Sequence, residues 1–87
     1  MSVYMVDREL PGITMEQLTD AQKAAIDTCR QMTAEGNAVR YIRTTFVPGE
    51  SHCMCLFDAP SEALVREAND KAQLPYNRIV PAMDLTP

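Results

Sequence analysis

The fold is decided by the stretch AVRYIRTTFVPGESHCMCLF, residues 38–57, in which two largely apolar runs flank a Pro-Gly turn. The first run is rich in β-branched and aromatic residues, which fit a pleated, half-buried surface. Pro48-Gly49-Glu50 is typical of a turn. The stretch therefore predicts a β-hairpin with strands over 38–47 and 52–57. The second strand is apolar on both faces, as expected of a strand that is covered on both sides.

The sequence before the hairpin predicts one strand and one helix. Residues 2–9 alternate between two faces, which indicates a strand. Thr14 and Gln17 have the spacing of a capping box, where two side chains satisfy the free N–H groups of a first helical turn. An apolar stripe at steps of three and four then predicts an amphipathic helix over 15–34, with Gly36 just after its end.

The sequence after the hairpin predicts a second helix and a final strand. The helix is expected to begin within 58–61 and to end at Leu74-Pro75, and the strand covers 78–83. Pro81 lacks an N–H donor, so this strand belongs at a sheet edge. The order β-α-β-β-α-β predicts an α+β, ferredoxin-like fold as a single domain over 1–87. Right-handed crossovers give a four-stranded antiparallel sheet in the order 4-1-3-2 with both helices on one face.

The other face of this sheet has no helix to cover it. The strands nevertheless carry apolar residues on both faces, since Val3 and Met5 alternate with Tyr4 and Val6. An exposed apolar sheet face is uncommon on a monomer. We therefore expect a homodimer in which two sheets stack, forming a dimeric α/β-barrel.

Composition and charge exclude several classes of protein. Eight Lys and Arg against twelve Asp and Glu give a net charge of −4, which argues against a nucleic-acid partner. The first residues lack the pattern of a secretory signal, and no apolar run approaches the roughly 20 residues of a membrane span, so we expect a cytoplasmic protein without a membrane partner. Three cysteines is an odd number, and we expect Cys29, Cys53 and Cys55 to be buried, small apolar side chains.

The expected sheet order brings charged residues together at one rim. The end of the first strand, with Asp7 and Glu9, lies beside the start of the third, with Glu50 and His52, the only histidine. An imidazole with carboxylates can bind a divalent transition metal such as nickel, zinc or copper. A two-fold axis would double this small set of ligands. Arg8 and Arg78 reach the same rim, where we expect them to form ion pairs with these carboxylates.

Five segments of the chain resemble a family of small bacterial proteins that is catalogued as a domain of unknown function and has nickel-binding actinobacterial representatives. The similar segments are Leu10-Pro11-Gly12, Arg40–Pro48, Cys53–Ser61, Val65–Asn69 and Leu74–Val80. The resemblance implies a ferredoxin-like fold, a homodimer and nickel binding at or near the dimer interface. It assigns no ligands, so Asp7, Glu9, Glu50 and His52 remain candidates from topology.

Three functions are compatible with these observations. The first is a metal-binding protein that prefers nickel and holds the ion without turnover. The second is a dimeric α/β-barrel that binds a small molecule or acts as a cofactor-free enzyme, with Tyr41, Arg43 and methionines around the ligand and His52 at the mouth. Tyr41 and Arg43 are expected on one face of their strand, where a barrel pocket could use them, although packing in the core is the simpler role for both. The third is a structural or regulatory dimer without a ligand.

Overall fold

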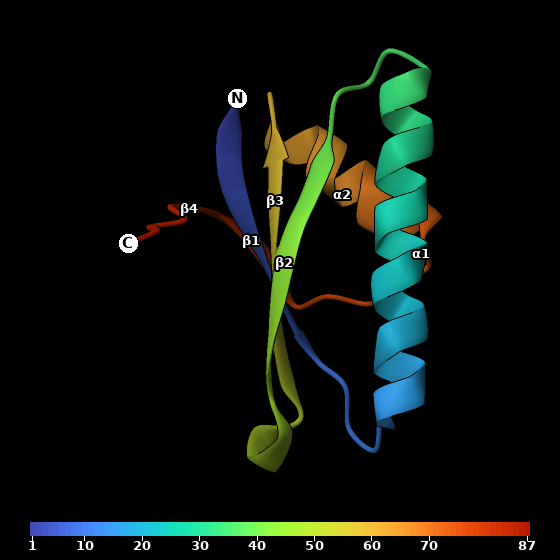
Figure 1. Cartoon of the computed structure of the whole chain (residues 1–87), viewed down its shortest axis with the longest axis vertical. Coiled ribbons are helices and arrows are strands. Elements are labelled where there is room, and N and C mark those ends of the chain that lie inside the picture. Colours follow the sequence, from blue (N-terminus) through green and yellow to red (C-terminus); the bar gives the residue numbers. More distant parts are fainter.

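The computed structural model describes residues 1–87 and has the expected order of elements (Figure 1). These elements are β1 (Ser2–Glu9), α1 (Met15–Ala34), β2 (Arg40–Val47), the 3-10 helix η1 (Pro48–Glu50), β3 (His52–Ala59), α2 (Glu62–Lys71) and β4 (Arg78–Ala82). All neighbouring strands are antiparallel, in the order β2-β3-β1-β4. Read from the other edge this is 4-1-3-2, so the predicted ferredoxin-like fold is confirmed. Neither helix has the length and apolar character needed to cross a membrane.

Helix α1 begins and ends where its local sequence predicts. The Thr14 hydroxyl accepts a hydrogen bond from the Gln17 N–H at 3.1 Å, and the Gln17 side chain accepts one from the Thr14 N–H at 3.0 Å. This capping box satisfies two N–H groups near the helix start. At the other end Gly36 has φ +97°, and the Asn37 N–H donates to the Met32 carbonyl at 2.9 Å. These are features of a Schellman motif, in which glycine adopts a left-handed backbone without steric cost.

The boundary between β3 and α2 lies later than the sequence predicts. β3 continues beyond residue 57 to Ala59, because Ala59 pairs with Ser2 at the start of β1. The helix start predicted within 58–61 is therefore too early. α2 begins at Glu62, and the Ser61 hydroxyl accepts a hydrogen bond from the Leu64 N–H at 3.4 Å as its N-cap.

The β2–β3 hairpin is present, but β2 begins at Arg40 and contains an irregularity. Tyr41 pairs with Phe57, whereas Arg43 pairs with Leu56, so the register shifts between them. An extra residue of this kind turns the following side chains to the opposite face of the sheet. The expectation that Tyr41 and Arg43 share one face is therefore wrong. Tyr41 points toward the helices and Arg43 toward the open side.

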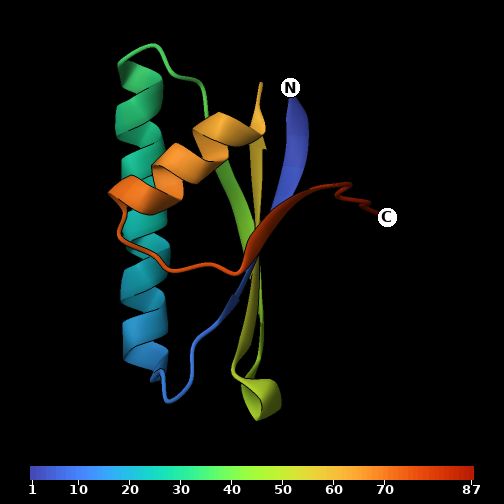
Figure 2. The same ribbon diagram turned by 180° about the vertical axis from the view of Figure 1, so that it is seen from behind.

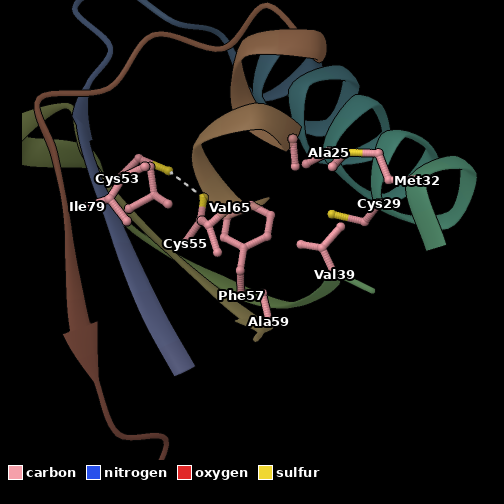
Figure 3. Close-up of a cluster of buried hydrophobic side chains, with 12 residues drawn as sticks. Ala25, Cys29, Met32, Val39, Cys53, Cys55, Phe57, Ala59, Val65 and Ile79 are labelled. Atoms are coloured by element: carbon pink, nitrogen blue, oxygen red, sulfur yellow. Dashed lines mark hydrogen bonds between the residues drawn. The ribbon is translucent and has the colours of Figure 1, made fainter. Parts of the chain in front are cut away.

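The hydrophobic core fills the layer between the two helices and one face of the sheet (Figure 3). Phe57, in an inner strand, is 1% exposed, and its ring packs edge-on against Tyr41 with 5.7 Å between ring centroids. The buried apolar residues are Val6, Ala25, Cys29, Met32, Val39, Cys53, Cys55, Phe57, Ala59, Val65, Ala68 and Ile79. This set contains only one aromatic ring, so Phe57 is its largest side chain.

The opposite face of the sheet carries no helix (Figure 2). Its apolar side chains are only partly covered, and they are Val3, Met5, Met54, Leu56 and Val80. Asp84, in the segment after β4, forms an ion pair with Arg43 of β2 at 2.8 Å, which joins one edge of the sheet to the other on this side. The neighbouring Met83 and Leu85 remain 79% and 82% exposed. The C-terminal segment therefore adds apolar surface on the open side of the sheet.

Candidate functional site

The sheet register places three of the four predicted metal ligands on the open face. Glu9 of β1 lies directly opposite His52 of β3, and Asp7 lies opposite Met54. Because alternate residues of a strand share a face, Asp7, Glu9 and His52 are neighbours at one end of this face. The prediction that the end of β1 meets the start of β3 is confirmed.

Asp7 is the centre of this group. One of its carboxylate oxygens is hydrogen-bonded to His52 Nε2, and the other accepts a hydrogen bond from Arg78 Nε at 3.0 Å. The Asp7 side chain is only 12% exposed and that of His52 29%, whereas that of Arg78 is 61% exposed. Both oxygens of a largely buried carboxylate are thus engaged, and the expected ion pair of Arg78 is confirmed.

The surroundings of Asp7 favour its ionised form. The hydrogen bond from His52 is the largest cause that lowers the pKa of the carboxyl below its ordinary value of 3.8. Burial acts in the opposite direction, and the bond from Arg78 adds to the lowering. Asp7 is therefore ionised throughout the neutral range.

The pKa shift of Asp7 predicts a pH dependence of stability in the metal-free protein. A carboxyl with a lowered pKa in the folded state contributes stability above its unfolded pKa, and that contribution is lost as the pH falls through the folded value. We expect the free energy of unfolding of the parent to fall more steeply than that of Asp7→Asn between about pH 4 and pH 2. Urea unfolding followed by circular dichroism at several pH values measures both slopes, and equal slopes would contradict this role of Asp7.

The other predicted ligands stand apart from the Asp7–His52 pair. Glu9 is exposed and its side chain has no hydrogen-bond or ion-pair partner, although it lies across from His52. Glu50 is exposed in η1, and the structure does not bring it to the pair. Arg8 does not pair with these carboxylates, because it points toward the helices and hydrogen-bonds to Asn69 and to the Pro75 carbonyl. That expectation for Arg8 is wrong.

One chain alone offers an incomplete set of metal ligands. Asp7 and His52 supply one oxygen and one nitrogen in contact, and no group of three or more His, Cys, Asp and Glu side chains lies close enough to hold an ion. Protein-bound transition metals commonly take three or four protein ligands. The residues in contact thus supply only part of a metal site, and Glu9, opposite His52 in the sheet, is a further candidate donor.

The three cysteines lie apart from this group, because they are buried on the helix side of the sheet. All three are free thiols. Burial is the main cause that raises the pKa of Cys29 to about 11. The sulfur atoms of Cys53 and Cys55 lie 3.7 Å apart under α1 and α2 (Figure 3). The hydrogen bond from Cys53 is the largest cause that lowers the pKa of Cys55 below its ordinary value, against the effect of burial, and the charge of Arg8 lowers it further.

Comparison with known proteins supports the fold and identifies the family. The crystal structure of SCO4226 from Streptomyces coelicolor A3(2) matches with a TM-score of 0.81, covering 98% of this chain and 100% of that chain. The two sequences are 20% identical, so this likeness concerns the fold. No curated protein matches the sequence. The family model described as "Nickel responsive protein SCO4226-like" matches residues 4–81, nearly the whole chain. The chain therefore belongs to the SCO4226-like family of nickel responsive proteins.

Proposed function

We propose that this protein is a cytoplasmic homodimer that binds nickel and holds the ion without turning over a substrate. The observation that carries the proposal is the contact between His52 Nε2 and the Asp7 carboxylate, in a chain of a nickel responsive family. Imidazole nitrogen suits nickel, and an ionised carboxylate adds the charge that a divalent cation needs. Three free, buried cysteines agree with a reducing compartment such as the cytoplasm.

His52, Asp7 and Glu9 are the proposed ligands. His52 and Asp7 are already in contact, and Glu9 is the cross-strand neighbour of His52 with a side chain that nothing else binds. Two subunits would together provide two imidazoles and up to four carboxylates. A shared site therefore removes the shortage of ligands in one chain.

The open face of the sheet supports the dimer on which this shared site depends. Partly covered apolar side chains lie on this face, and the ion pair Arg40–Asp58 lies at one end of it. A protein interface typically combines an apolar core with polar and charged groups around it. A second copy offers the same apolar surface, so two-fold stacking covers both faces at once.

Nickel binding is expected to displace Arg78 from Asp7. The Arg78 guanidinium is mostly exposed and holds one Asp7 oxygen at 3.0 Å, so it can move into solvent when a cation takes that oxygen. The positive charge of Arg78 near the site also repels the bound cation. Removing this charge should leave nickel affinity unchanged or increase it.

Calorimetric titration of the metal-free protein with Ni²⁺ tests the function and the ligands together. We expect saturable binding to the parent, and a loss of affinity of about 100-fold or more in His52→Ala, since substitution of groups that merely orient ligands already costs 10–100-fold. Arg78→Gln is the matched control at the same carboxylate, and it should bind at least as tightly as the parent. Elemental analysis of the purified protein should find nickel.

Two outcomes would count against the proposal in different ways. A parent protein that does not bind Ni²⁺ would overturn the function. Parent-like affinity in His52→Ala would leave nickel binding intact but contradict the ligand assignment. Glu9→Gln should give a smaller loss than His52→Ala, because the structure does not hold Glu9 in contact with the pair.

A further inference from the structure

Arg8 is a buried cation that forms no ion pair with a carboxylate. Only 2% of its surface is exposed. Its Nη1 donates to the Pro75 carbonyl at 3.1 Å and its Nη2 to the Asn69 side-chain oxygen at 2.8 Å, and both acceptors are neutral. Its Nε is buried and has no hydrogen-bond partner. Buried charges are ordinarily paired, and an unpaired buried polar group is costly, so this guanidinium requires a further partner.

Arg8 lines a cavity of about 160 Å³ between α1 and the helix-facing side of the sheet. Leu18, Ala21 and Ala25 of α1 form one wall, and most of the lining is apolar. An apolar cavity of about 150 Å³ in another protein binds benzene. A cavity of this size therefore suits a ligand of roughly six to ten non-hydrogen atoms. The cavity therefore combines an apolar chamber with one unpaired buried cation.

The charge of Arg8 also favours the ionised form of one thiol in the cavity. Cys53 and Cys55 line it together with Arg8. The positive charge of Arg8 is among the causes that lower the pKa of Cys55, after the hydrogen bond from Cys53. The guanidinium thus favours negative charge on a group beside it.

We propose that this cavity binds a small organic acid of about the size of benzoate, with its carboxylate toward Arg8 and its apolar body against α1. A carboxylate matches a guanidinium in geometry and charge and is small enough for this cavity, and charge-assisted bonds of this kind are about twice as strong as neutral ones. Asn69, held by its own bond to the Val65 carbonyl at 2.9 Å, fixes Arg8 in place for the ligand. The cavity lies on the opposite side of the sheet from Asp7 and His52, so the proposal does not depend on nickel.

Titration of the metal-free, full-length protein with benzoate tests the site, with benzyl alcohol as a neutral ligand of similar size. Amide chemical shifts in two-dimensional NMR spectra give the affinity of each. We expect saturable benzoate binding that is at least tenfold tighter than that of benzyl alcohol. The amides of Arg8 and of residues 18–25 should move. Benzoate that does not bind, or that binds no tighter than benzyl alcohol, would overturn the proposal.

Two leucine substitutions in α1 provide a test that leaves Arg8 untouched. Ala21→Leu fills the cavity and should weaken benzoate binding by at least tenfold. The added side chain occupies empty space, so we expect the variant to fold. Ala34→Leu adds the same atoms at an exposed position at the end of α1 and should bind like the parent. Parent-like binding in Ala21→Leu would place the ligand elsewhere and contradict the site. Arg8→Met, if it folds, should lose the preference for benzoate over benzyl alcohol.

Discussion

Phe57→Ala is expected to lower the free energy of unfolding by about 3–5 kcal/mol, which is a large part of the total for a domain of this size. Phe57 is 1% exposed, lies in the inner strand β3 and packs edge-on against Tyr41. Its removal leaves a cavity in a core that contains no other buried ring. Urea unfolding followed by circular dichroism measures the loss, at one fixed protein concentration because self-association would add to stability.

The second phenylalanine of the chain provides the matched control. Phe46 is only partly buried and lies near the end of the edge strand β2, opposite Cys53. Phe46→Ala removes the same atoms from a site that water already reaches, so we expect less than half the loss of Phe57→Ala. Equal losses would show that β3 and the core beneath the helices do not dominate stability.

Local signals in the sequence were sufficient for α1 and the sheet order, but not for α2, which ends at Lys71 rather than at Leu74-Pro75. Thr14, Gln17 and Gly36 mark the ends of α1 because capping depends on side chains and backbone conformations within a few residues. Pro81 marks β4 as an edge strand because proline cannot donate to a second neighbour. Right-handed crossovers then leave one sheet order for the four strands.

The irregularity in β2 could not be predicted in the same way. It falls between Tyr41 and Arg43, where no glycine or proline indicates it. Its place is set by packing, since Tyr41 contacts Phe57 under the helices while Arg43 reaches Asp84 on the other side. β3 likewise extends to Ala59 because Ser2 of β1 is there to pair with it, and that pairing is not visible in the segment itself.

The candidate site was partly predictable because it follows from register. The sheet order alone placed Asp7 near His52 and Arg78. The same alternation contained a signal about Arg8 that the expected ion pairs overlooked. Arg8 shares its face with Tyr4 and Val6, so it had to point toward the helices, away from Asp7. A charged residue on the core side of a strand is unusual, and Arg8 lines the cavity under α1.

The two faces of the sheet have separate consequences. The helix side is closed and contains the core and Arg8, whereas the open side contains the Asp7–His52 pair beside apolar side chains that remain partly exposed. Ligand binding under α1 can therefore persist in a monomer. The proposed nickel site cannot, because one chain lacks enough ligands. Separating the subunits of the proposed dimer should therefore abolish nickel binding and leave ligand binding under α1 intact.

Leu56→Asp is expected to convert a dimer of about twice 9.7 kDa into a monomer, measured by light scattering after size exclusion. Leu56 lies on the open face of β3, where its partners in the sheet are Met5 and Arg43, so stacking would bury one new carboxylate from each subunit without a partner. Nickel affinity should fall with the dimer. Met15→Asp, at an exposed position in the first turn of α1, introduces the same charge on the helix side and should remain dimeric and bind nickel. A parent of 9.7 kDa at micromolar concentration, or a Leu56→Asp variant that stays dimeric, would refute stacking through this face.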